Sequence, residues 1–117
     1  MPLNTAQVGK DIVEALKSIA GKNAGKLNSF AIEQKRLLLE AALALTQAVT
    51  EGSIKYGSAR YKFFEKTIAE QTKDFAIAVA TLIAVAVQEA YDAISAILWD
   101  SIRGAIGLSK IATPALP

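Results

Sequence analysis

The side chains available for acid–base chemistry are mainly carboxylates, because the chain of 117 residues contains no histidine and no cysteine. This excludes disulfides, thiolate chemistry, zinc sites built on cysteine and histidine, and nucleophiles activated by a histidine base. The acids Glu65, Glu70, Asp74, Glu89 and Asp92 do not repeat the ligand pattern of a four-helix metal centre. We therefore expect no enzyme, no metal and no cofactor.

Two other motifs that carry chemistry in proteins are incomplete in this chain. GKNAGK, at residues 21–26, lacks the Lys-Ser/Thr pair that completes a phosphate-binding P-loop. Glu89 and Asp92 lie three positions apart in an apolar segment, and if buried they would need partners or raised pKa values. We expect no small-molecule substrate.

Basic and aromatic residues are mixed in the segment 54–66, IKYGSARYKFFEK. Such a mixture can hold a nucleic-acid backbone or anchor a turn at lipid head groups. Tyr61 and Phe64 also fall on the apolar stripe of a helix, which leaves the cations to solubilise its outer side. The net charge of +2 does not favour nucleic acid as a partner. The candidate lipid or anion contacts are Lys55, Tyr56, Arg60 and Lys62.

The stretch around which the chain is organised is residues 75–87, with no charge between Asp74 and Glu89. Alanine alternates with bulky aliphatic residues throughout it, so no side of this segment suits water. The whole chain is 52% hydrophobic with a mean hydropathy of +0.30, which is high for a small soluble monomer. Because a small chain has little interior, we expect the excess apolar surface to meet other subunits or lipid.

Glycine and proline divide the chain into helical segments. Neither occurs in residues 26–51 or 58–103, and helix interiors exclude proline and disfavour glycine. Asn4 is a good N-cap for the first helix, and Gly104 is placed to end the third helix after Arg103. We predict an all-α single domain over residues 1–117, with helices at about 5–20, 28–51 and 58–103 and an irregular tail at 104–117.

The middle of the third predicted helix has a second interpretation. Ile77, Val79, Ile83, Val85 and Val87 alternate with alanine, which also fits a buried strand. We favour helix, because alanine favours it and helical stripes flank the run on both sides. No second strand is available to pair with it.

The lengths of the predicted helices indicate how they pack. Residues 5–51 and residues 58–103 are nearly equal in length and are separated by a glycine-containing turn. Folded about this turn they form a long antiparallel helical hairpin, with the first arm broken at glycines. In this register 75–88 faces about 21–34, and the first helix covers 89–104. Faces left bare by the hairpin are expected to meet other copies of the chain or lipid.

The predicted function is that of a non-enzymatic structural subunit, which assembles with copies of itself into a filament, sheath or coat. The basis is a segment that is apolar on all sides, in a chain without catalytic chemistry. The predicted self-assembly interface consists of Phe75, Ile77, Val79, Ala80, Leu82, Ile83, Ala84, Val85, Val87, Tyr91, Ile94, Leu98, Trp99 and Ile102.

The alternative is a membrane-active hairpin, pore-forming or related to secretion. Residues 75–88 supply 14 uncharged positions, which make about 21 Å of helix against about 30 Å for the hydrocarbon core. A conventional single span is therefore not favoured, whereas insertion of a hairpin tip stays open. The N-terminal residues show no secretory signal, and the compartment is left open between an extracellular or virion-like assembly and association with a membrane.

Overall fold

The structure is a computed structural model that describes residues 3–27 and 32–117. In these residues the fold consists of four α-helices and one 3₁₀ helix. No strand occurs in these residues, so the predicted all-α class is confirmed, and the alternating run beyond Asp74 is helical as far as Ile83. In chain order the elements are α1 (Thr5–Ala20), η1 (Gly21–Leu27), α2 (Ile32–Glu51), α3 (Ala59–Ile83) and α4 (Val87–Ile106).

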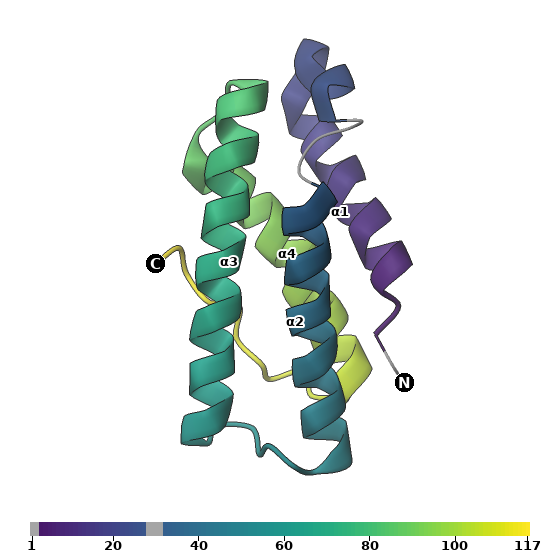
Figure 1. The fold of residues 1–117 in the computed structure, drawn as a ribbon, viewed down its shortest axis with the longest axis vertical. Helices are drawn as coiled ribbons and strands as arrows, with labels where there is room; N and C mark the ends of the chain where they lie inside the picture. Colours follow the sequence, from purple (N-terminus) through teal and green to yellow (C-terminus); the bar gives the residue numbers. More distant parts are fainter. Residues whose placement is uncertain (1–2, 28–31) are drawn as a thin grey trace.

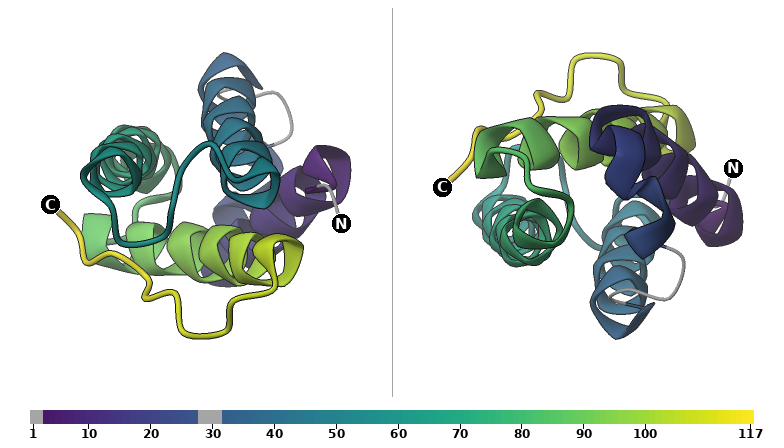
Figure 2. Two further views of the ribbon diagram at one scale, coloured as in Figure 1. Left: turned by 90° about the horizontal axis from the view of Figure 1, so that it is seen from below. Right: turned by 90° about the horizontal axis from the view of Figure 1, so that it is seen from above.

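The four α-helices surround a shared hydrophobic core. α2 and α3 lie side by side, α4 crosses behind them, and α1 packs against α4 and α2 (Figure 1). Seen along the bundle, the helices enclose a common interior (Figure 2). Each contributes fully buried side chains to it, among them Ile12 from α1, Leu38 from α2, Ile68 from α3 and Trp99 from α4.

The folded chain has the size and surface of an ordinary monomer. Its radius of gyration is 13.9 Å, against about 13.4 Å for a compact domain of this length. Its accessible surface is 6325 Å², against about 6,100 Å² for a monomer of this mass. The apolar residues that the composition shows in excess are therefore accommodated mainly inside the chain.

α1 forms where the sequence predicted the first helix, with its N-cap at Asn4. The side-chain oxygen of Asn4 accepts a hydrogen bond from the backbone N–H of Gln7 at 3.1 Å. The helix ends at Gly21, which has a φ of 57°. η1 follows where the first arm of the hairpin was predicted to break at glycines. The apolar stripe of α1 lies in the core at Val8, Ile12 and Leu16.

The single helix predicted at 58–103 is wrong, because the chain breaks at 84–86 into α3 and α4. Ala84 adopts the left-handed conformation, with φ 58° and ψ 48°. The N–H groups of Ala84 and Val85 both bond to the carbonyl of Ala80. The physical reason is burial: when α4 turns back, the apolar faces of α3 and α4 cover each other within one chain. Helix propensity, which depends only on local sequence, contains no information about the free energy gained by this burial.

Because of this break the fold is not built on one long helical hairpin: α3 ends after 25 residues, and the chain then turns back into α4. Some contacts that the hairpin register predicted are nevertheless present. The side-chain amide of Asn23 in η1 donates to the carbonyl of Ile83 at 3.1 Å, and α1 packs along α4. Some neighbouring segments were thus predicted correctly, although the second arm of the predicted hairpin is divided into α3 and α4.

α4 continues through Gly104, where the sequence predicted its end, and stops at Gly107. Gly107 has a φ of 82°, which favours glycine, and its N–H bonds to the carbonyl of Arg103 at 2.8 Å. A glycine inside a helix costs about 1 kcal/mol relative to alanine. Ile102 is fully buried and Ile106 packs against the core, so contacts on both sides of Gly104 keep the chain helical.

α2 ends at Glu51, as the sequence predicted. The predicted start of this helix, at residue 28, lies outside the described residues. Within α2, the fully buried residues recur at spacings of four and three, so they lie on the one side of the helix that faces the core. These residues are Leu38, Ala42 and Leu45.

The tail is irregular from Gly107 onward and runs along the outer side of α4 (Figure 2). The hydroxyl of Tyr91 donates to the carbonyl of Pro114 at 2.9 Å, and the guanidinium of Arg103 donates to the carbonyl of Ile111 at 2.9 Å. Ile111 itself is 2% exposed. The tail is therefore packed onto the chain's own last helix.

Candidate functional site

The segment that the sequence singled out for lipid or anion contacts lies at one end of the bundle, which we call the basic end. It comprises the turn between α2 and α3 and the first two turns of α3, at the bottom of Figure 1, together with one residue of the tail. All of its defining side chains are exposed. They are Lys55, Tyr56, Arg60, Lys62, Phe63, Lys66 and Lys110.

Two glycines and one apolar anchor shape the turn of the basic end. Gly52 and Gly57 both have a φ of 84°, a conformation that glycine adopts readily. Ile54, only 4% exposed, points into the core, and its N–H donates to the carbonyl of Ala48 at 3.2 Å. With Ile54 fixed inward, the next residue, Lys55, is presented to solvent.

A small aromatic cluster connects this turn to α3 and to the tail. Ser58 caps α3, because its hydroxyl accepts a hydrogen bond from the N–H of Tyr61 at 3.2 Å. The rings of Tyr56 and Tyr61 meet edge to face, with centroids 4.9 Å apart. The ammonium of Lys110 lies 5.4 Å from the centroid of Tyr56, a cation–π contact. Residues far apart in the sequence are thus held together at this end.

Phe63 is the most exposed large hydrophobic side chain in the described part of the chain, at 68%. Arg60, Phe63 and Lys66 follow one another at a spacing of three, which places them on the same outer face of α3. The neighbouring ring of Phe64 is half-buried and meets Phe63 edge to face at 6.0 Å. Phe63 is not among the predicted lipid contacts, although its place beside the core stripe and between two cations was a signal for it.

Positive charge dominates the basic end. Residues 51–66 hold four basic and two acidic side chains, and Lys110 adds a fifth cation. Of the two acids, Glu51 is exposed and Glu65 is half-buried. Burial raises the pKa of the Glu65 carboxyl, while the charge of Lys62 lowers it.

Tyr61 lies beneath this surface and is 1% exposed. Its hydroxyl has no hydrogen-bond partner among the described residues. Burial raises its pKa well above the ordinary value of 10.0, and the charges of Glu65 and Tyr56 act in the same direction. A phenol of this kind stays neutral at physiological pH, so Tyr61 supports the turn as a packed side chain.

The predicted self-assembly interface lies largely inside the chain's own core. The buried members are Phe75, Val79, Ala80, Ile83, Tyr91, Ile94, Leu98, Trp99 and Ile102. Leu82, Val85 and Val87 are half-buried, whereas Ile77 and Ala84 are exposed. The requirement for an outside partner, inferred from the sequence, is therefore met for most of these side chains by the chain's own helices. Assembly through the remaining ones stays a prediction.

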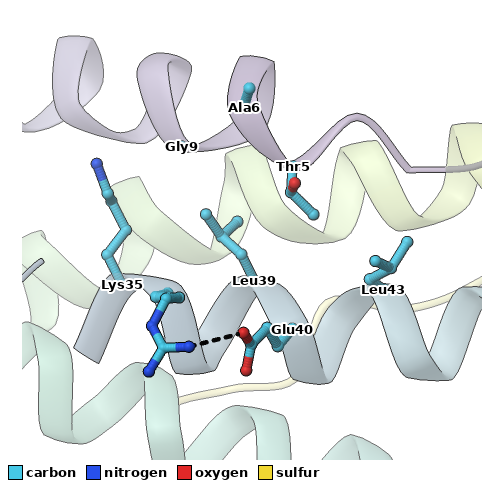
Figure 3. Close-up of a pocket in the computed structure, with 8 residues that line it drawn as sticks. Thr5, Ala6, Gly9, Lys35, Leu39, Glu40 and Leu43 are labelled. Atoms are coloured by element: carbon cyan, nitrogen blue, oxygen red, sulfur yellow. Dashed lines mark hydrogen bonds and ion pairs between the residues drawn. The ribbon is translucent and has the colours of Figure 1, made fainter. Parts of the chain in front are cut away.

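A groove of about 320 Å³ lies between α1 and α2 (Figure 3). Leu39 points from α2 toward Gly9, where a Cβ atom would lie 3.1 Å from the leucine Cδ1. Arg36 and Glu40 at its edge form an exposed ion pair of 3.1 Å. Its lining does not bring a nucleophile together with a base, so the groove offers no evident catalytic chemistry.

A second groove, of about 480 Å³, lies between α4 and the tail, and its charged lining residues are Asp92, Asp100 and Arg103. The hydroxyl of Ser95 is buried here, and within the described part of the chain it has no hydrogen bond of good geometry. It nevertheless lies near enough to Tyr91 to lower the pKa of that phenol, against the larger raising effect of burial. Asp92 and Asp100 are both exposed, as expected of carboxylates on the outside of a helix.

The acidic residues that were tested above as candidates for a metal or catalytic site lie mostly at the surface. Glu70, Asp74, Glu89 and Asp92 are exposed on α3 and α4. Within residues 3–27 and 32–117, no three acidic side chains come together as a metal site would require. In the same part of the chain, no helix combines the length and apolar character needed to cross a bilayer.

Comparison of the chain with protein-family models, with curated proteins and with solved structures finds no match. Its function must therefore be inferred from the geometry of the described residues.

Proposed function

We propose that this is a non-enzymatic protein that binds reversibly to anionic phospholipid surfaces through its basic end. The single observation that carries the proposal is Phe63, a large apolar ring that is 68% exposed among cations. Apolar side chains surrounded by lysine and arginine are typical of proteins that lie on a membrane interface.

The expected contributions are large enough for reversible binding. Full burial of a phenylalanine side chain is worth about 1.5–3 kcal/mol, and each basic residue close to an anionic surface adds about 1 kcal/mol. The basic end offers one such ring and five cations. These contributions support docking on the head groups, with the bundle intact, rather than insertion of a helix.

Lipid fits the basic end better than nucleic acid does. Single-stranded nucleic acid is held on aromatic rings whose faces are open for stacking. Here Tyr61 is buried, Phe64 is half-buried, and Lys110 lies over the ring of Tyr56. Phe63 is the most exposed of these rings, which suits a wedge between lipid head groups more than a platform for successive bases.

Vesicle co-sedimentation tests the proposal. We expect the chain to sediment with vesicles that contain phosphatidylglycerol and to stay in solution with phosphatidylcholine alone. Phe63→Ser should weaken binding roughly ten- to hundredfold. Ile77→Ser is the matched control, because Ile77 is also an exposed apolar residue of α3 but lies outside the basic end.

A second arm of the same experiment tests the charges. Replacement of Lys55 and Lys62 by glutamine should weaken binding to anionic vesicles and reduce its dependence on salt. Equal binding by Phe63→Ser and the unmodified chain would overturn the proposal, as would equal binding to neutral and anionic vesicles. Binding to single-stranded DNA without binding to vesicles would reject lipid as the partner in favour of nucleic acid.

A second candidate is the structural subunit that assembles with copies of itself. The observation that favours it is an uncharged outer strip on the second half of α3, continuing into the turn: Ile77, Thr81 and Ala84 are all exposed and recur at spacings of four and three. Light scattering combined with negative-stain microscopy tests it in the absence of lipid. Regular assemblies that Ile77→Asp abolishes would support it, and a monomer at every concentration would reject it.

A further inference from the structure

The turn between α3 and α4 lacks the residues that normally break a helix. Its left-handed position is occupied by Ala84, with φ 58° and ψ 48°, although a side chain beyond glycine disfavours this region. Ala86, at the N-cap of α4, makes no side-chain capping bond. Alanine is also the best helix former, so the local sequence favours a continuous helix through this turn.

Tertiary contacts hold the turn closed. α3 and α4 pack on each other through apolar faces that include Phe75 and Val79 on one side and Tyr91 and Ile94 on the other. In a continuous helix, the carbonyl of Ile83 would accept the N–H four residues further on. In the bundle, the side-chain amide of Asn23 bonds to that carbonyl instead.

A chain that straightened alone would expose the buried face of α4. Leu98, Trp99 and Ile102 are each 0% exposed in the bundle, so their transfer to water is strongly unfavourable. A second copy of the same chain offers an identical site for α4. The tail would travel with α4, because Tyr91 and Arg103 hold it there.

We propose that residues 84–86 are a hinge, and that two copies of the chain exchange α4 by straightening it. In the exchanged dimer, residues 59–106 form one helix of about 72 Å, and α4 of each copy packs in the bundle of the other. The helix-to-helix core contacts of the bundle are kept, whereas the strained turn and the hydrogen bond from Asn23 to the Ile83 carbonyl are lost. Short, strained hinges of this kind favour domain exchange.

The exchange is a route to self-association through the buried face of α4 and not through the exposed strip of α3, and it does not depend on binding to lipid. It also explains how a segment that folds back in the bundle carries the sequence pattern of one long helix. Reciprocal exchange between two copies closes a dimer, whereas one-directional exchange continues from copy to copy as a filament.

Spin-label distances within one chain test the hinge directly. The protein has no native cysteine, so Glu70→Cys with Asp100→Cys gives one clean pair of labelling sites, both exposed. In a straight helix these sites are about 45 Å apart, which exceeds the 44 Å length of the whole folded bundle. Labelled chains are diluted into unlabelled chains and refolded from guanidinium at low and high protein concentration, without vesicles.

We expect monomers with the short distance at low concentration, and dimers with the distance of about 45 Å at high concentration. Ala86→Pro should keep the chain monomeric, because Ala86 already has φ −69° and ψ 146°, which suit proline, and proline cannot lie inside a continuous helix. Ala59→Pro is the matched control, since proline is tolerated at the first position of α3. It should exchange like the unmodified chain.

Ala84→Gly provides a second variant that does not introduce proline. Glycine relieves the left-handed turn and disfavours the straight helix, so dimerisation should weaken roughly tenfold for each of the two hinges. The proposal is overturned if no dimer forms, if the dimer shows only the short intrachain distance, or if Ala86→Pro and Ala84→Gly dimerise as well as the unmodified chain. None of these outcomes bears on vesicle binding.

Discussion

The side-chain amide of Asn23 donates a hydrogen bond to the carbonyl oxygen of Ile83 at 3.1 Å, and thereby joins η1 to the end of α3 across 60 positions of sequence. Ile83 is the last residue of α3, and its carbonyl lacks the partner that a continuing helix would supply. The bond therefore satisfies the end of α3 at the point where the chain turns back, and it links the first part of the chain to the α3–α4 pair.

Asn23→Ala should lower the free energy of unfolding by about 1 kcal/mol, because the Ile83 carbonyl loses its partner. Guanidinium unfolding monitored by the fluorescence of the single tryptophan, the fully buried Trp99, measures this. Gln47→Ala, at an exposed position of α2, serves as the control and should leave the midpoint unchanged. An equal midpoint for Asn23→Ala would show that solvent replaces the bond without loss.

Gly104→Ala and Gly107→Ala should shift stability in opposite directions. Gly104 lies inside α4 with open space where a Cβ would stand, so alanine should stabilise the chain by about 0.5–1 kcal/mol. Gly107 has a φ of 82°, so alanine there should destabilise by about 1 kcal/mol. Thermal unfolding of both variants measures the difference. Two shifts of the same sign would contradict the end of α4 at Gly107.

Stability should fall at alkaline pH because burial raises the pKa of Tyr61 and Tyr91. Below pH 10 the phenols are protonated in both the folded and the unfolded chain, so they contribute no pH dependence. Above the ordinary value of 10.0, the unfolded chain releases these protons while the folded chain retains them. The free energy of unfolding should then fall by up to about 1.4 kcal/mol per pH unit for each phenol.

Guanidinium unfolding between pH 8 and pH 11, two values chosen around the ordinary tyrosine pKa of about 10, measures this slope. Tyr61→Phe should remove its share of the slope at little cost in stability near neutral pH, because the Tyr61 hydroxyl is buried without a partner in the described part of the chain. A slope that is unchanged in Tyr61→Phe would mean that other groups cause the alkaline loss.

Several features of the fold follow from local sequence. The cap at Asn4 and the end of α2 at Glu51 depend on contacts within a few residues, and the structure has them where they were predicted. The basic end could also be read from the mixture of cations and aromatics. The sequence did not identify Phe63 as the most exposed ring of that segment, because this depends on which side α3 turns toward the core.

The sequence by itself determined that the chain is helical, that it lacks histidine and cysteine chemistry, and that most apolar side chains of residues 75–87 need cover from water. Tertiary structure alone decided what shields them. Ala84 would extend a helix by its own propensity, yet it takes the left-handed conformation because the turn lets α4 cover α3 and bury residues such as Trp99. Burial between segments outweighs the small local preference of one residue, and no local pattern records that balance.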